Sequence, residues 1–115
     1  MNNGQLTNKR IAVYQRAELP EARQAQLESN LEFVGRAGGN PSRALVFDDI
    51  SKARPQLARV LEKVEAREVD AVVVNDLSRL TRSYEDMEAT LRTLARCGVA
   101  LHVVTDSHGK ASERE

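Results

Sequence analysis

Short apolar runs alternate along this chain with segments in which apolar residues recur every three or four positions. Such runs are typical of buried strands, and the three- and four-residue spacing is typical of helices that turn one face toward a core. The helical spacing predicts three helices, which begin at Pro20, Pro55 and Ser83. Four apolar runs predict the strands that flank them, at residues 11–14, 44–47, 69–74 and 99–104.

The third run, residues 69–74, is the strongest strand prediction, because four valines in six residues suit a strand that is covered on both faces. Strands that alternate with crossover helices predict an α/β fold of three layers, α/β/α, with a mainly parallel sheet. We expect the first strand to be central. Residues 10–106 are predicted to form this single domain, with a flexible N-terminus at 1–9 and a flexible C-terminal tail at 107–115.

Arginines follow three of the predicted strands at the edge where the strands end. Arg16 follows the first strand, Arg54 the second, and Arg79 and Arg82 the third. Parallel α/β sheets place their sites outside the carboxyl ends of the strands, and guanidinium groups bind phosphate through paired N–H donors. The cluster therefore predicts phosphate chemistry. The alternative is that each arginine pairs with a nearby carboxylate and stabilises the fold little.

Composition limits the partners of this site. Lys and Arg together number 17, as do Asp and Glu, so the zero net charge supplies no broad basic field and any DNA affinity must be local and modest. The single Cys97 excludes an intramolecular disulfide and suits a reduced, cytoplasmic protein. No membrane span or secretory leader is expected. His102 and His108 have no partner at ligand spacing, so no metal site is predicted.

Five segments of the chain carry a resemblance to a known family. They are residues 14–16, 24–27, 47–51, 54–57 and 69–82, and the last contains the run Asp-Leu-Ser-Arg-Leu-Thr-Arg. Together they resemble the N-terminal catalytic domain of serine recombinases, the resolvase and invertase family. The resemblance covers roughly residues 10–106 and implies a resolvase-like catalytic domain.

The resemblance implies a strand-exchange chemistry. In the family, a serine on the loop after the first strand attacks a DNA phosphodiester and forms a 5′-phosphoserine link without metal or cofactor, while arginines stabilise the phosphoryl charge. By position, Arg16, Arg54, Arg79 and Arg82 match the family's active-site arginines. Supporting polar positions are, by the same matching, Tyr14, Gln26, Asp49, Asp76 and Ser78.

The chain departs from the family at the nucleophile. The pattern Tyr-x-Arg-x-Ser here ends in Glu18. A carboxylate that attacks a phosphodiester brings one anion to another and would give a hydrolysable acyl phosphate, so we expect no cleavage by Glu18. Instead, its carboxylate is predicted to neutralise the arginines as an internal plug. Ser51 and Ser78 are the only stand-ins at this edge, and each is expected to be a loop or turn residue.

Three functions remain open. The leading hypothesis is a recombinase-family protein that has lost strand cleavage and regulates DNA recombination by pairing with itself or with a full-length recombinase. The second is an active strand-exchange enzyme that uses another nucleophile or is a fragment of a longer chain. The third is a small α/β interaction domain or a decaying mobile-element product. The family's long interface helix and separate DNA-binding domain are expected to be absent, so the chain alone is not expected to recombine DNA.

Overall fold

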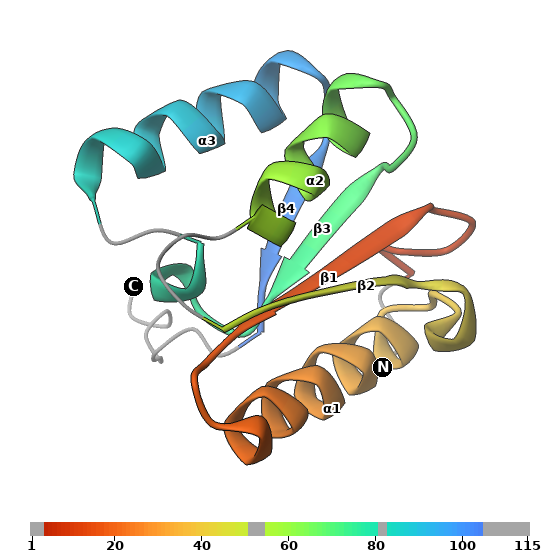
Figure 1. Cartoon of the computed structure of the whole chain (residues 1–115). Helices are drawn as coiled ribbons and strands as arrows, with labels where there is room; N and C mark the ends of the chain where they lie inside the picture. Colours follow the sequence, from red (N-terminus) through yellow and green to blue (C-terminus); the bar gives the residue numbers. More distant parts are fainter. Residues whose placement is uncertain (1–3, 51–54, 81–82, 105–115) are drawn as a thin grey trace, which may run out of the picture.

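Four parallel strands form one sheet in a computed structural model of the protein, which describes residues 4–50, 55–80 and 83–104. Their order across the sheet is β2-β1-β3-β4, so β1 is a central strand, as predicted. All three pairs of neighbours are parallel (Figure 1). The strands are β1 (Ile11–Arg16), β2 (Leu45–Asp49), β3 (Ala71–Val74) and β4 (Ala100–Val103).

Helices cover both faces of this sheet. The helix α1 (Pro20–Arg36) packs on one face, and α2 (Pro55–Glu65) and α3 (Tyr84–Arg96) pack on the other (Figure 1). This arrangement confirms the three-layer α/β/α prediction. Two short 3₁₀ turns, η1 (Pro41–Arg43) and η2 (Leu77–Arg79), were not predicted. No helix in the described ranges is both long and apolar enough to cross a membrane.

The predicted helix starts are confirmed, and each has a local cause. Pro20 and Pro55 are the first residues of α1 and α2, where the ring presets the backbone angle and the missing N–H is not needed. The side-chain oxygen of Ser83 accepts a hydrogen bond from the backbone N–H of Asp86 at 3.2 Å and caps α3. Gly98, with φ of +71°, follows the end of α3 in a conformation that favours glycine.

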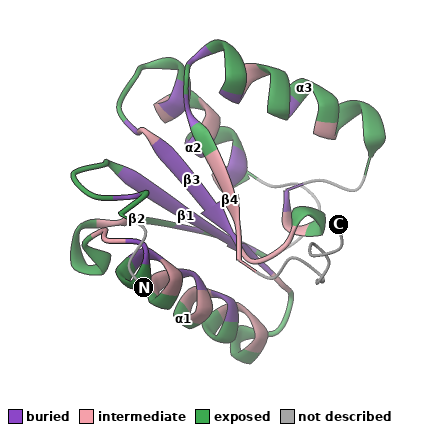
Figure 2. Cartoon of the chain, turned by 180° about the vertical axis from the view of Figure 1, so that it is seen from behind, coloured by how far each residue is buried: buried purple, intermediate pink, exposed green. Residues whose placement is uncertain are grey.

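The apolar core lies on both sides of the sheet because alternate residues of β1 face opposite ways. Tyr14 belongs to the cluster under α2 and α3, whereas Val13 packs with Val34 of α1. Figure 2 shows β1 and β3 buried along their lengths. Leu6 joins the α1 cluster, and its backbone N–H donates to the carbonyl oxygen of Ala37 at 2.9 Å. Part of the segment 1–9, for which we expected flexibility, is therefore packed against the domain.

The strand boundaries differ from those read from apolar runs. β1 continues two residues past Tyr14, because Gln15 and Arg16 stay in register with Asp48 and Asp49 of β2. Polar side chains do not end a strand whose backbone has a partner. β3 begins only at Ala71, two residues after the predicted start, and β4 is one residue shorter at each end than predicted.

Candidate functional site

The carboxyl ends of β1, β2 and β3 meet at one edge of the sheet, where the sequence predicted a site. Arg16 and Asp49 are register partners at the ends of β1 and β2, and η2 with Arg79 follows β3. The structure therefore brings Arg16 and Arg79 together from segments 63 residues apart. The other two predicted arginines, Arg54 and Arg82, lie outside the described residues.

Arg16 fastens η2 to the end of β1. Its side chain is 7% exposed, and Nη2 and Nε donate to the backbone carbonyl oxygens of Ser78 at 3.0 Å and Arg79 at 3.3 Å. In return, Nη1 of Arg79 donates to the carbonyl oxygen of Arg16 at 3.5 Å. A guanidinium group that bonds two successive carbonyls fixes the backbone of the turn. Arg16 thus positions Arg79 at this edge.

Asp76 and Ser78 shape the turn that carries Arg79. One carboxylate oxygen of Asp76 accepts hydrogen bonds from the backbone N–H of Ser78 at 3.0 Å and from its hydroxyl group. The other lies 3.6 Å from Nε of Arg79. Leu80, almost fully buried, anchors the end of the turn in the core. The Arg79 side chain is 33% exposed, so its charge is held at the surface of a fixed turn.

Gln26 of α1 binds both backbone groups of Arg16. Its side-chain oxygen accepts from the Arg16 N–H at 3.0 Å, and its side-chain nitrogen donates to the Arg16 carbonyl at 3.1 Å. Gln26 is 6% exposed, which is low for an amide side chain and is explained by these two hydrogen bonds. Gln26 thus holds the backbone at the end of β1, and its supporting role in a reaction stays a prediction.

Asp49 connects β1, β2 and α2. Its buried carboxylate accepts the Tyr14 hydroxyl at 2.8 Å and the backbone N–H groups of Gln56 and Leu57, each at 2.9 Å. These amides belong to the first turn of α2, whose N–H groups have no partner within the helix. The carboxylate thus caps α2 from a neighbouring strand, and a negative charge there also suits the helix dipole.

Glu18 does not form the internal plug that we expected with the described arginines. The residue is exposed, and within residues 4–50, 55–80 and 83–104 its carboxylate has no ion pair with Arg16 or Arg79. Only its backbone is held, because Nη1 of Arg23 donates to the carbonyl oxygens of Ala17 at 2.8 Å and Glu18 at 3.3 Å. The turn after β1 directs the Glu18 side chain to solvent, and Arg16 finds its partners in η2 instead.

Sequence reasoning missed a buried polar network beneath the site. Gln15 and Asn30 are fully buried, and Nδ2 of Asn30 donates to Oε1 of Gln15 at 2.7 Å. Nε2 of Gln15 then donates to the Asp48 carboxylate at 2.7 Å, which links α1 to β2. A second link joins Asn75 to Ser29 at 3.3 Å. The sequence offers little signal for this network, because Gln15 and Arg16 follow the apolar run and read as residues outside the strand.

The described titratable side chains outside this edge do not assemble a metal site. Among the described residues, no group of three or more His, Cys, Asp and Glu side chains is arranged to hold a metal ion. Burial lowers the pKa of His102, whose ring lies 5.6 Å from that of Phe33 in α1. Cys97 is a buried free thiol in the core. Both residues pack in the fold and stand apart from the arginine edge.

Comparison with known proteins now identifies the family. Residues 11–115 match the family described as Resolvase, N terminal domain. The fold resembles the C-terminal catalytic domain of ISC1926 TnpA, an IS607-like serine recombinase, with 24% identity, a TM-score of 0.76, and coverage of 91% of this chain and 74% of that one.

Two further solved structures share this fold. The first ORF in transposon ISC1904 from Sulfolobus solfataricus P2 has 18% identity, a TM-score of 0.71, and coverage of 90% of this chain and 73% of that one. The N-terminal catalytic domain of TP901-1 integrase has 20% identity, a TM-score of 0.68, and coverage of 86% and 79%. Comparison with curated proteins finds no significant match. The expectation drawn from the arginine run is confirmed: the chain belongs to the resolvase N-terminal domain family, a serine-recombinase domain related to site-specific recombination.

Proposed function

We propose that this protein is a serine-recombinase domain that does not cleave DNA and that regulates recombination by pairing with an active relative. The observation that carries the proposal is Glu18, a carboxylate where the family resemblance expects the serine nucleophile. Its side chain is exposed two residues after β1 ends, and Arg16 at that strand end holds the turn that carries Arg79. A phosphate at this edge would meet a second anion instead of a hydroxyl group.

The chemistry of a carboxylate disfavours strand exchange here. Attack by Glu18 on a phosphodiester would join two anions, and the resulting acyl phosphate would be open to hydrolysis, whereas a serine ester stores the bond for religation. Arg79 still offers a partly exposed cation on a turn that Arg16 fixes. The edge therefore suits weak contact with a DNA phosphate better than its cleavage.

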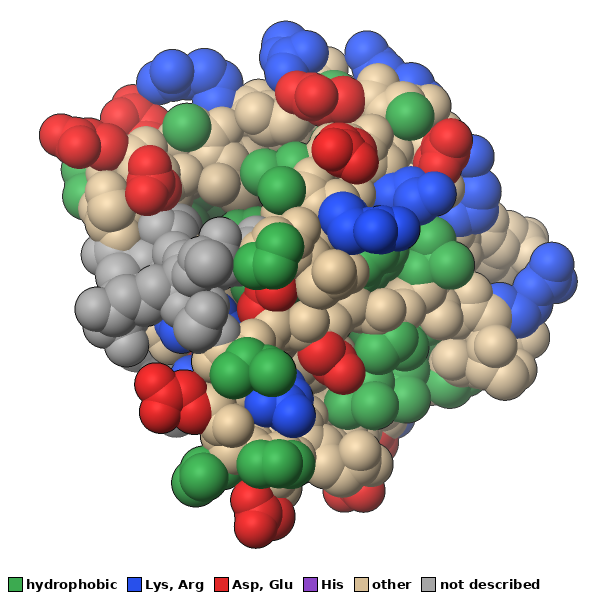
Figure 3. All heavy atoms as spheres, in the orientation of Figure 1, with side chains coloured by type: hydrophobic (Ala, Val, Ile, Leu, Met, Phe, Trp, Pro, Cys, Tyr) green, Lys and Arg blue, Asp and Glu red, His purple; other side chains and the backbone are tan. Residues whose placement is uncertain are grey.

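The molecular surface supports weak DNA binding and a protein partner. Positive and negative side chains are interspersed over the face in Figure 3, so this face has no broad basic field for DNA. The zero net charge adds no overall attraction. Tyr84 is 83% exposed and Leu91 39% exposed, and both lie on one side of α3 because they are seven residues apart. This side of α3 is where we place the contact with a partner chain.

Covalent trapping on a nicked suicide DNA substrate tests the loss of cleavage. The active domain of a resolvase serves as a positive control, and a denaturing gel separates protein-DNA adducts. We expect no adduct with the wild-type chain or with Glu18→Gln. An adduct with the wild-type chain would overturn the proposal. Size-exclusion chromatography with a full-length relative tests pairing, and separate elution at micromolar concentrations would count against it.

A second candidate is an active enzyme that uses Ser78, because its hydroxyl group donates to the Asp76 carboxylate in the manner of a nucleophile beside a base. Ser42 offers a matched control, since its hydroxyl donates to the side-chain oxygen of Asn40 in the other 3₁₀ turn, at 2.7 Å. An adduct that persists in Ser42→Ala and is lost in Ser78→Ala would establish this candidate. An adduct that survives in both variants would exclude Ser78.

A further inference from the structure

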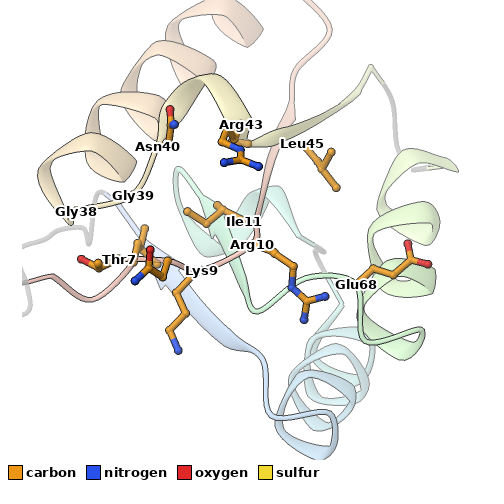
Figure 4. A pocket seen from close by; sticks show the side chains of 13 residues that line it. Thr7, Lys9, Arg10, Ile11, Gly38, Gly39, Asn40, Arg43, Leu45 and Glu68 are labelled. Atoms are coloured by element: carbon orange, nitrogen blue, oxygen red, sulfur yellow. The ribbon is translucent and has the colours of Figure 1, made fainter.

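A second basic site lies at the opposite end of the sheet from the arginine edge. A pocket of about 550 Å³ opens where β1 and β2 begin, and this volume is within the range of pockets that hold small ligands. Figure 4 shows its walls, which come from the segment before β1, the turn between α1 and η1, the start of β2 and Glu68 after α2. Of the motif arginines that the structure describes, neither Arg16 nor Arg79 lines it.

The charge of this pocket is positive and partly uncompensated. Lys9, Arg10 and Arg43 line it, together with one carboxylate, that of Glu68. Arg10 pairs with Asp70 at 3.0 Å and Glu68 with Lys63 at 3.0 Å, so these two groups already have partners in the fold. In the part of the chain that the structure describes, Lys9 and Arg43 have no ion pair. Lys9 also lies near Asp70, because its charge helps to lower the pKa of that carboxyl. The four cations Lys9, Arg10, Arg43 and Lys63 still exceed the two carboxylates Glu68 and Asp70 by two positive charges.

The backbone around Lys9 and Arg43 is held in place before any ligand binds. The N–H of Lys9 donates to the carbonyl of Leu6 at 3.1 Å, and Leu6 is buried. The N–H of Arg43 donates to the carbonyl of Asn40 at 3.0 Å within η1. Gly39 lies between the two segments with no room for a side chain, because a Cβ atom there would lie 2.8 Å from Ile11. A fixed backbone lowers the entropy that binding would cost.

We propose that this pocket binds a small phosphomonoester through Lys9 and Arg43. A phosphomonoester carries about −1.5 to −2 charges at pH 7, which matches the excess of two positive charges around the pocket, whereas a phosphodiester carries one negative charge. Guanidinium and ammonium groups bind phosphate through charge-assisted hydrogen bonds. Ile11 and Leu45 supply apolar wall for a compact organic group. The site is independent of the arginine edge and of the cleavage defect proposed above.

Titration of ¹⁵N-labelled full-length protein with adenosine 5′-monophosphate, monitored by amide chemical shifts, tests the site. Adenosine is the uncharged control, and inorganic phosphate tests the anion alone. We expect the monophosphate and phosphate to shift amides in residues 7–11 and 38–45, and adenosine to shift none. No shift at millimolar concentrations, or shifts confined to residues 75–80, would overturn the proposal.

Two charge-removing variants give the matched comparison. Arg43→Gln removes a pocket cation, and Arg59→Gln removes an exposed cation of α2 that does not line the pocket. We expect Arg43→Gln to weaken binding about tenfold, as the loss of one charge-assisted contact implies, with Arg59→Gln unchanged. Equal weakening in both variants would refute a localised site. An oligonucleotide without terminal phosphates that binds here as tightly as the monophosphate would refute the choice of a phosphomonoester.

Discussion

Replacing Asp49 with alanine should destabilise the whole domain, because this buried carboxylate joins two strands and a helix. The variant removes the acceptor of two N–H groups in the first turn of α2, and loss of such a cap costs about 0.5–2 kcal/mol. It also removes the acceptor of the buried Tyr14 hydroxyl, a net contribution of about 0.5–1.5 kcal/mol. We therefore expect the free energy of unfolding to fall by about 1–3 kcal/mol.

Urea denaturation followed by circular dichroism measures this loss, and a double-mutant cycle isolates the strand contact. Tyr14→Phe removes the same hydrogen bond from the other side, so Asp49→Ala and Tyr14→Phe should couple by at least about 0.5 kcal/mol. Asp49→Asn keeps one acceptor oxygen, so its free energy of unfolding should fall less than that of Asp49→Ala. The reasoning is refuted if Asp49→Ala changes stability by less than about 0.5 kcal/mol, or if the two substitutions are additive.

Other predictions concern the opposite end of the sheet. Hydrogen bonds from Arg10 lower the pKa of Asp70 from 3.8 to about 2, so this pair stabilises the fold above pH 4 and its contribution disappears as the pH falls toward 2. In Arg10→Gln, the free energy of unfolding should therefore depend less on pH between about 2 and 4. A pH dependence equal to that of the wild-type protein would contradict this prediction. Gly39→Ala should cost about 1–3 kcal/mol by overpacking beside Ile11. A Cβ atom at Gly35 would lie 3.5 Å from Pro41, so Gly35→Ala should instead raise the free energy of unfolding by about 0.5–1 kcal/mol, measured in urea. A Gly39→Ala variant more stable than Gly35→Ala would contradict this account.

The layer architecture followed from the sequence because burial and periodicity are local signals. The valines of β3 are buried on both faces, as an unbroken apolar run indicates. Strand ends were less predictable, since Gln15 and Arg16 read as polar residues that follow β1. Their backbone groups pair with β2, and Gln15 meets Asn30 from a helix 15 residues away, a partnership that spacing alone does not reveal.

The sequence predicted where the site residues come together, but not which hydrogen bonds they make. Parallel topology brings Arg16 and η2 to one edge, which the sequence indicated. The topology does not determine whether a guanidinium group faces a ligand or a backbone carbonyl. In the structure, Arg16 donates to the carbonyls of Ser78 and Arg79. The orientation of Glu18 depends likewise on the turn that Arg23 holds, and this turn has no distinct sequence signature.

Gln26 makes the position of the end of β1 depend on the position of α1. Because its amide binds both the N–H and the carbonyl of Arg16, it replaces the two hydrogen bonds that a neighbouring strand would make with this residue. The last residue of β1 is thereby attached to α1 as well as to the sheet. A shift of α1 along the sheet would carry the Arg16 backbone with it and, through the Arg16 side chain, would pull on η2. A movement of α1 should therefore change the position of Arg79.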